Sequence, residues 1–306
     1  MKPLLAIDWG TSSLRGALLG DAGEVIDERM HARGILTVAP GEFPQVFESL
    51  FGDWMRPARL CLMSGMVGSR QGWQEAPYCA CPAGFDDIAA HLAWVQPGRI
   101  AIVPGLACAR EALAGEPALA TLHDVMRGEE TQILGALRLL GVRDATLVLP
   151  GTHSKWVRVA GGRIESFTTF MTGEFFALLR HHSILGRTMP ETDAGSDATA
   201  FALGVRVALK GESLLSTAFS VRTVALFEQL EERRRSDYLS GLVIGEELRV
   251  QPPIDGTVIV VGAAALAGRY RDALALKGVA SRCIGAEATW AGLWAIAQSH
   301  EGTEVK

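Results

Sequence analysis

Residues 3–19 read Pro-Leu-Leu-Ala-Ile-Asp-Trp-Gly-Thr-Ser-Ser-Leu-Arg-Gly-Ala-Leu-Leu. A short apolar run ends at Asp8, a polar turn with a Gly-Thr pair follows, and a second apolar run continues to Leu19. Turn residues at 20–23 then lead into a third expected strand over residues 24–29. Dinucleotide-binding and Walker-type folds need a helix directly after their glycine-rich turn, and their glycine patterns are absent from this segment. The segment therefore predicts a meander of three strands.

The same pattern recurs near the middle of the chain. An apolar run over residues 146–149 is followed by Pro150-Gly151-Thr152-His153-Ser154, an expected strand over 155–160, a Gly-Gly turn and another strand over 163–168. Strand hairpins with glycine turns are common, so chance could produce this agreement. We nevertheless interpret it as an internal duplication separated by about half the chain.

The remaining pattern places helices between and after these two segments. The apolar spacing predicts a helix over residues 128–141, ended by Gly141. Further expected elements are helical structure over 221–235, a helix over 236–250, a buried strand over 257–261 and a closing helix over 286–297.

The bulk composition favours an ordinary globular α/β protein of two domains. The chain has 306 residues, 48% hydrophobic residues and a formal net charge of −5. It contains no long run of like charges, so neither nucleic acid nor an anionic membrane is expected as a partner. The five cysteines are odd in number and follow no disulfide or zinc spacing. With no secretory signal or membrane span in the sequence, we expect a cytoplasmic protein.

Two Gly-Thr turns, each between strands, offer backbone N–H groups and hydroxyls to an anion, and together could hold a triphosphate. The residues of these turns are Gly10, Thr11, Ser12, Ser13, Gly151, Thr152, His153 and Lys155. Asp8 lies at a strand end beside the first turn and could hold Mg²⁺ through its waters. A turn-capping aspartate is the alternative for Asp8, and a structural histidine is the alternative for His153.

Three segments in this order resemble the phosphate-1, phosphate-2 and adenosine elements of the sugar kinase/actin/heat-shock superfamily. They are Asp8-Trp9-Gly10-Thr11, Gly151-Thr152 and residues 258–266. The resemblance implies an α/β, two-domain actin/hexokinase-like (ribonuclease H-like) fold, with ATP and Mg²⁺ in a cleft between the domains. It also implies that Gly262 and Ala263 lie against the adenosine.

More specific strings resemble the 2-dehydro-3-deoxygalactonokinase family over nearly the whole chain. They include Met63-Ser64-Gly65-Met66-Val67-Gly68-Ser69, Val125-Met126-Arg127-Gly128-Glu129-Glu130-Thr131-Gln132, Pro150-Gly151-Thr152-His153-Ser154-Lys155-Trp156 and Met171-Thr172-Gly173-Glu174. This resemblance implies ATP-dependent phosphorylation of 2-dehydro-3-deoxy-D-galactonate at its C6 hydroxyl, in galactonate breakdown.

A carboxylate that accepts the hydroxyl proton is expected among three glutamates. Glu129 is the first choice, because Gly128-Glu129 is similar to a Gly-Asp pair in related carbohydrate kinases. Its side chain is one methylene longer than aspartate, so Glu130 stays a rival, and Glu174 is the third candidate. Alternatively, Glu129 and Glu130 have no catalytic role and only stabilise the helix, because negative side chains are favoured at the positive N-terminal end of its dipole.

The implied substrate carries a carboxylate, a keto group and hydroxyls. Arg127 could bind the carboxylate with its planar fork, or form a surface salt bridge instead. Other expected substrate residues occupy a glycine-rich loop that could also be a plain strand-to-loop junction. With Arg127 and Glu174, which lie outside this loop, the expected substrate residues are Ser64, Met66, Gly68, Ser69, Trp73, Arg127 and Glu174.

We expect an N-terminal domain over residues 1–145 and a C-terminal domain over 146–306, with the last helix able to cross back. Two other functions stay open from the sequence. One is a kinase of the same fold acting on 2-dehydro-3-deoxygluconate or another sugar acid, because fold does not fix function. The other is a non-catalytic ATP-binding regulator. A homodimer is also left open.

Overall fold

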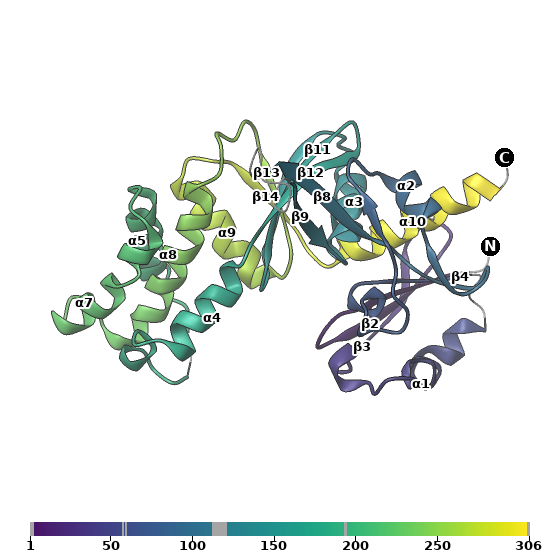
Figure 1. The fold of residues 1–306 in the computed structure, drawn as a ribbon, viewed down its shortest axis with the longest axis horizontal. Helices are drawn as coiled ribbons and strands as arrows, with labels where there is room; N and C mark the ends of the chain where they lie inside the picture. Colours follow the sequence, from purple (N-terminus) through teal and green to yellow (C-terminus); the bar gives the residue numbers. More distant parts are fainter. Residues whose placement is uncertain (1–2, 57, 59, 112–120, 193–194, 305–306) are drawn as a thin grey trace. The chain divides into compact units, whose positions relative to one another are not determined.

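The computed structural model describes residues 3–56, 58, 60–111, 121–192 and 195–304 (Figure 1). The chain divides into two compact units, which are described separately here. Unit 1 comprises Met1–Ala145, Val157–Phe167 and Ala286–Lys306, and unit 2 comprises Thr146–Trp156 and Thr168–Gly285. Each unit is therefore made of chain segments that are far apart in the sequence.

The first sheet is built on the predicted meander. Strands β1 (Leu4–Trp9), β2 (Leu14–Leu19) and β3 (Val25–His31) pair antiparallel, and β1 also pairs parallel with β4 (Leu60–Ser64). Strands β7 (Ile100–Ile102) and β6 (Ala93–Gln96) complete the order β3-β2-β1-β4-β7-β6. β1 and β4 are buried because their uninterrupted apolar runs suit a central strand covered on both faces.

Helix α1 (Phe43–Met55) covers part of this sheet with an apolar stripe. Phe43, Val46, Phe47 and Phe51 recur at helical spacing and are buried in one cluster with Ile7 and Trp9 of β1. This packing fixes β1 from one face, so the position of its carboxyl end is set by a well-filled core.

The second sheet repeats the arrangement of the first. β10 (Ala145–Leu149), β11 (Ser154–Ala160) and β12 (Arg163–Phe170) lie side by side, and β13 (Val258–Val261) pairs parallel with both β10 and β14 (Ser281–Ile284). The order is β12-β11-β10-β13-β14. Each sheet therefore has a three-strand meander followed by two further strands parallel to its first strand, which confirms the predicted duplication.

Helices make up most of the rest of unit 2. They are α4 (Thr172–His182), α5 (Ala198–Leu209), α6 (Leu214–Thr217), α7 (Ser220–Leu226), α8 (Arg235–Arg249) and α9 (Ala264–Leu276), with short 3-10 turns at Gly186–Thr188 and Glu232–Arg234. Buried side chains of α5, α8 and α9 pack with β10 and β13 in one core cluster.

The helical structure expected over residues 221–235 is present in α7 and in the 3-10 turn at Glu232–Arg234, with an interruption between them. α7 ends at Leu226, and Glu228 adopts a left-handed backbone with φ of 55°. The N–H of Glu228 donates to the Ala225 carbonyl at 3.2 Å, and the N–H of Gln229 donates to the Val224 carbonyl at 2.8 Å. These two bonds form a Schellman motif, which ends a helix by satisfying its last carbonyls. Glutamate occupies the position where glycine would have signalled the stop.

In unit 1, α3 (Glu129–Leu140) packs against α10 (Glu287–Glu304). A Cβ on Gly135 would lie 1.8 Å from the Ala288 carbonyl oxygen, and one on Gly292 would lie 2.0 Å from that of Thr131. The two backbones therefore approach more closely than any larger side chain would allow. The expected closing helix exists and is several residues longer than predicted.

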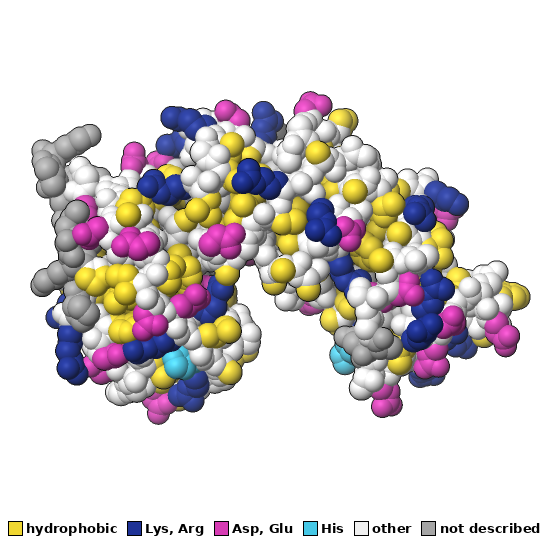
Figure 2. Space-filling model, turned by 180° about the vertical axis from the view of Figure 1, so that it is seen from behind, with side chains coloured by type: hydrophobic (Ala, Val, Ile, Leu, Met, Phe, Trp, Pro, Cys, Tyr) yellow, Lys and Arg dark blue, Asp and Glu magenta, His cyan; other side chains and the backbone are white. Residues whose placement is uncertain are grey.

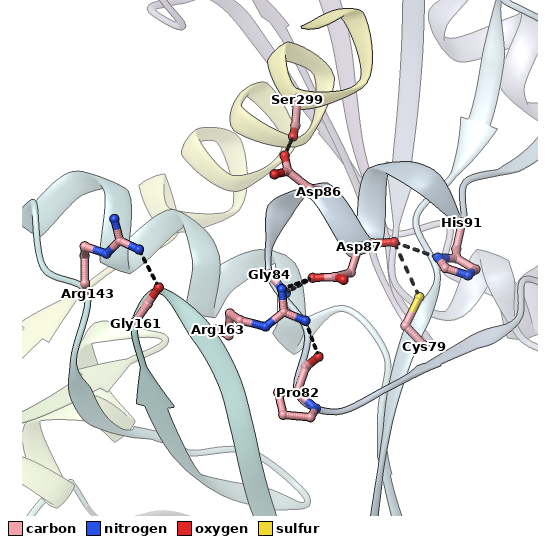
Figure 3. Close-up of polar contacts among 10 residues, drawn as sticks. All are labelled: Cys79, Pro82, Gly84, Asp86, Asp87, His91, Arg143, Gly161, Arg163 and Ser299. Atoms are coloured by element: carbon pink, nitrogen blue, oxygen red, sulfur yellow. Dashed lines mark hydrogen bonds and ion pairs between the residues drawn. The ribbon is translucent and has the colours of Figure 1, made fainter. Parts of the chain in front are cut away.

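A smaller sheet and a short helix complete unit 1. The sheet has the order β5-β8-β9, from β5 (Tyr78–Ala80), β8 (Gly105–Glu111) and β9 (Thr121–Met126), and the helix is α2 (Phe85–Ala90). Figure 3 shows how α2 is anchored: Asp87 accepts from the Gly84 N–H at 2.8 Å and pairs with Arg163 at 2.8 Å. Arg163 also donates to the Pro82 carbonyl at 2.7 Å, and Ser299 of α10 bonds to Asp86.

Charged side chains of both signs are interspersed on the face of the molecule seen in Figure 2. Within the described residues, no helix has both the length and the apolar character needed to cross a bilayer. The predicted fold class, α/β with two sheets of ribonuclease H-like order and two units, is confirmed.

Candidate functional site

In unit 1, three chain segments converge at the carboxyl ends of β1 and β4. Asp8 of β1 lies beside Ser64 of β4 in the parallel register. Gly65 has φ of 95°, and a Cβ there would lie 2.9 Å from the Trp9 carbonyl oxygen and 3.3 Å from Asp8 Oδ1. Gly128, with φ of 105°, precedes α3, and a Cβ there would lie 3.3 Å from the Gly65 Cα. The left-handed backbone of both glycines lets Asp8 and the start of α3 approach the same point.

Asp8 is held by a neighbour on the adjacent strand. Arg15 faces Asp8 in the antiparallel register of β2, and its Nη2 lies 2.5 Å from Asp8 Oδ2. The exposed fractions of the two side chains are 22% for Arg15 and 18% for Asp8. The Arg15 guanidinium also lies 5.6 Å from the ring centre of Trp290 on α10. The carboxylate is therefore fixed in place and still reachable from solvent.

The first Gly-Thr turn has a fixed backbone and exposed side chains. The Gly10 N–H donates to the Ser13 carbonyl at 2.9 Å, and the Gly10 carbonyl accepts from the Ile35 N–H at 3.0 Å. Thr11, Ser12 and Ser13 are exposed. Three hydroxyls in sequence on a rigid turn form a surface that can donate to an anion.

The two glutamates that begin α3 differ in environment. Glu130 is completely buried, and both of its oxygens accept from the Gly128 N–H, at 2.9 and 2.7 Å. Burial, together with the negative charge of Glu129, raises the pKa of Glu130 to about 7. Glu129 is half-buried, and its Oε2 accepts from the Arg127 N–H at 3.0 Å. Of the two carboxylates, only Glu129 is partly open to solvent.

Arg127 has donor atoms that are buried and unused. Its Nη2 donates to the Ala76 carbonyl at 2.8 Å, and its guanidinium lies 4.4 Å from the ring centre of Tyr78. Its Nε and Nη1 are buried and have no hydrogen-bond partner within the described part of the chain, and the same is true of Ser69 Oγ. Buried donors without partners are rare in proteins and call for an explanation, such as a ligand or ordered water.

The other residues predicted for the sugar acid lie around this loop with different exposure. Ser64 is 1% exposed and its hydroxyl bonds to that of Thr131 at 2.9 Å. Gly68 is buried, and a Cβ there would lie 2.9 Å from Arg127 Nη1. Met66 and Trp73 are partly buried and pack against the core, with the Trp73 ring 6.5 Å from that of Trp9. These positions shape the loop that borders Arg127.

In unit 2, the second Gly-Thr turn contacts the start of α4. The N–H of Glu174 donates to the Thr152 carbonyl at 3.0 Å. The side chains of His153 and Glu174 pair at 2.5 Å, and both are about half exposed. Glu174 therefore lies beside the second Gly-Thr turn, whereas the other predicted substrate residues belong to unit 1.

Three predicted nucleotide-binding residues occupy different environments within unit 2. Lys155 is 6% exposed, and its Nζ donates to Thr169 Oγ1 at 2.7 Å on the neighbouring strand β12. Gly262 follows β13 and its N–H donates to the Ile284 carbonyl at 3.0 Å. Ala263 is exposed at the position that precedes α9.

A cavity of about 460 Å³ lies in unit 2 beside the second Gly-Thr turn. It is lined by residues of the turn and of helices α4, α8 and α9, among them Gly151, Thr172, Asp237, Ser240, Leu266 and Tyr270. Asp237 is buried and pairs with Arg269 of α9 at 2.5 Å. The volume of the cavity lies in the range of small-molecule binding sites.

Sequence reasoning missed several of these groups. Arg15 could have been found from the sequence. In an antiparallel hairpin of β1 and β2, Arg15 lies directly opposite Asp8, and side chains at opposite positions can reach each other. Thr172 and Tyr270 carried no such signal, since only the packing of α4 and α9 brings them to one cavity.

A comparison with protein families identifies the chain. The family model described as 2-keto-3-deoxy-galactonokinase matches residues 8–296, which is most of the sequence. The chain belongs to this family. The resemblance predicted from the sequence strings is thereby confirmed.

Curated relatives and a crystal structure agree with this membership. A probable 2-dehydro-3-deoxygalactonokinase of Rhizobium meliloti (strain 1021) is 38% identical over 303 residues, covering 96% of each chain. The 2-dehydro-3-deoxygalactonokinase of Escherichia coli (strain K12) is 34% identical over 277 residues, covering 90% of each. A crystal structure of a Sinorhizobium meliloti protein named for the same kinase is similar with a TM-score of 0.85 and 38% identity, covering 97% of this chain and 98% of the other.

Proposed function

We propose that the protein transfers the γ-phosphoryl group of ATP to the C6 hydroxyl of 2-dehydro-3-deoxy-D-galactonate, giving the 6-phosphate. The observation that carries the proposal is the family match over residues 8–296, together with two kinase relatives at 34–38% identity over at least 90% of their length. The residues around Gly65 in unit 1 and the cavity in unit 2 each carry groups of the kinds that this reaction would use. We further propose a cytoplasmic location.

ATP would use the two Gly-Thr turns and the cavity. The exposed hydroxyls of Thr11 to Ser13 and the turn at Gly151 and Thr152 suit phosphate oxygens, and the 460 Å³ cavity beside Gly151 suits the nucleoside. Asp8 suits Mg²⁺, because a single partly exposed carboxylate leaves the other positions of the ion to water and phosphate. Mg²⁺ supplies charge neutralisation on the phosphates during phosphoryl transfer.

We assign Glu129 as the group that accepts the proton from the substrate hydroxyl. Its carboxylate is partly open to solvent at the start of α3, next to the point where Gly65 and Asp8 meet. Glu130 is unsuited to contact a substrate directly, because its oxygens bond to the Gly128 N–H inside the core. In this assignment Glu130 fixes the turn that presents Glu129.

We assign Arg127 and Ser69 to the sugar acid. A guanidinium with buried Nε and Nη1 that lack partners among the described residues can bind a carboxylate with two parallel bonds. The stacking of the guanidinium on Tyr78 holds its plane in one orientation. The unpaired Ser69 hydroxyl can bind a neighbouring keto or hydroxyl oxygen.

The deciding experiment is a coupled ATP–Mg²⁺ assay of the purified protein with 2-dehydro-3-deoxygalactonate and its gluconate epimer side by side. We expect a higher kcat/KM for the galacto epimer. Turnover of the gluco epimer alone would assign the other substrate, and ATP binding without turnover of either would overturn the substrate proposal. Arg127→Lys, which keeps the charge and loses the fork, should raise the KM of the sugar acid and leave that of ATP unchanged.

A further inference from the structure

Glu247, on the buried side of α8, is a carboxylate that the proposed reaction does not use. It is 2% exposed. Its Oε1 accepts from Ser154 Oγ at 2.7 Å and from Trp156 Nε1 at 2.6 Å, while its Oε2 accepts from Tyr270 OH at 2.7 Å and from Thr172 Oγ1. Four donors thus surround the two oxygens.

This carboxylate has hydrogen bonds but no counter-ion within the described ranges 3–56, 58, 60–111, 121–192 and 195–304. Burial raises its pKa, and the four hydrogen bonds oppose that rise. A buried carboxyl group without a cation is a poor source of stability, because apolar residues could fill the same space at lower cost. Its presence therefore suggests a role in the site that its donors belong to.

Two of the four donors line the 460 Å³ cavity, and the other two belong to the strand that follows the Gly151 turn. Ser154 and Trp156 begin β11, directly after the Gly151 turn, Thr172 is the first residue of α4, and Tyr270 belongs to α9. Thr172 and Tyr270 themselves line the cavity, as does Gly151. One carboxylate thus connects the phosphate-2 turn to two walls of the cavity.

The direction of these bonds determines what the cavity wall can offer. A hydroxyl has one proton and two lone pairs. The protons of Thr172 and Tyr270 are directed at Glu247, so these residues can present only lone pairs to a ligand. An N–H or O–H of a ligand can bond to such oxygens, whereas a phosphate oxygen is repelled by them.

We propose that Glu247 is a positioning residue that makes this part of the cavity an acceptor surface, and thereby selects the nucleoside end of ATP and rejects its phosphates. This inference rests on the proposed function, since it concerns the same nucleotide site. Ribose hydroxyls and the adenine amino group are the donors of ATP that fit. The phosphates are directed to the Gly-Thr turn instead.

Glu247→Gln tests the direction of the bonds while keeping their number. The glutamine oxygen can accept from Trp156, which can only donate, and from Ser154. Its NH₂ then faces Thr172 and Tyr270, whose hydroxyls must turn to accept it and point their protons elsewhere. Glu246→Gln is the matched control, because Glu246 is the adjacent residue and pairs with Arg249 near the surface.

The measurement is calorimetric binding of adenosine, ATP and inorganic tripolyphosphate to the three proteins, with thermal unfolding alongside. For Glu247→Gln we expect adenosine and ATP to bind about tenfold more weakly, the order of one lost hydrogen bond to a fixed partner. Tripolyphosphate should bind as to the wild type or more tightly. Glu246→Gln should match the wild type with all three ligands.

Wild-type affinity of Glu247→Gln for adenosine and ATP would overturn the inference. An equal loss for adenosine and tripolyphosphate would also overturn it, because this is the result of a collapsed site. If Glu247→Gln does not fold, Tyr270→Phe and Thr172→Val each remove one acceptor, and unchanged adenosine binding by both variants would refute the proposal. Absence of ATP binding by the wild type would instead refute the proposed function.

Discussion

At the scale of single residues, the two adjacent glutamates at the start of α3 have opposite roles in the proposed mechanism. Glu129 is partly open to solvent, and Glu130 is enclosed with both oxygens bonded to the Gly128 N–H. The sequence placed both at a helix start beside Arg127. It could not separate them, because one residue of helix rotates a side chain by roughly 100° and only the packing of α3 shows which one faces the core.

Glu129→Gln should reduce kcat by about two to four orders of magnitude, the usual contribution of a positioned general base. Binding of ATP should be unchanged, because Glu129 is not among the residues proposed to bind the nucleotide. Steady-state kinetics and calorimetric ATP binding check both parts. Glu174→Gln serves as a control at the third carboxylate, and a full loss of turnover there with normal turnover in Glu129→Gln would assign the base to Glu174.

Glu130 should make stability depend on pH. Its pKa in the folded protein is about 7, above its ordinary value of 4.5. A raised acid pKa gives stability that is present below about pH 4.5 and is lost as the pH rises through about 7. The melting temperature of the wild type should therefore fall between about pH 5 and 8 by more than that of Glu130→Gln. Parallel pH profiles of the two proteins would show that Glu130 does not titrate in this range.

At the scale of elements, α3 owes its position to its close contact with α10. Gly135 and Gly292 bring the two backbones together, and α3 carries Glu129 and Glu130 in its first turn. Sequence periodicity predicted both helices, with good bounds for α3 and with an end for α10 that is several residues too early. Their contact was not predictable, because glycines inside a helix indicate close packing without naming the partner.

Gly135→Ala should destabilise the protein by about 1–3 kcal/mol, the usual cost of overpacking, because its Cβ would lie 1.8 Å from the Ala288 carbonyl oxygen. Denaturant unfolding measures this change. The control is Gly302→Ala in α10, where nothing lies within 4 Å of the added Cβ, and alanine should be neutral or stabilising. Equal stability of the two variants would show that the helices can separate at no cost.

Glu247 and Glu228 show where element-level prediction reached its limit. Glu247 follows Leu239 and Val243 at intervals of four in α8, so an acidic residue on an apolar stripe was visible in the sequence. Its four donors come from three other elements and could be found only in the fold. Glu228 ends α7 with a left-handed backbone in place of the usual glycine, so the sequence did not show where the helical structure after residue 221 is interrupted.

At the scale of the whole molecule, the repeated strand order was the most predictable feature. The two Gly-Thr segments lie between the first and second strands of their sheets, at β1–β2 and β10–β11, as the sequence indicated. Local strand and turn signals were sufficient there, because each meander is formed by neighbours in sequence. Assignment of the parallel strands β4 and β13 depends on long-range pairing, which a single sequence does not contain.

Binding of ATP should stabilise the whole chain. A ligand present at 100 times its Kd adds about 2.7 kcal/mol to the free energy of unfolding, so the melting temperature should rise by several degrees. Thermal melts with ATP–Mg²⁺, and with ATP plus a chelator, measure the shift and its metal dependence. A shift that is unaffected by the chelator would contradict the assignment of Asp8 to Mg²⁺, and no shift at all would contradict ATP binding.

The return of α10 to unit 1 has a consequence for how the protein is made. Ribosomes deliver the chain from its N-terminus, so α10 emerges after every other described element. All of unit 2 has then already left the exit tunnel and can fold, because domains fold as units during translation. The face of α3 around Gly135 stays uncovered until α10 arrives. During synthesis, unit 2 can therefore finish folding before unit 1, although most of unit 1 is synthesised first.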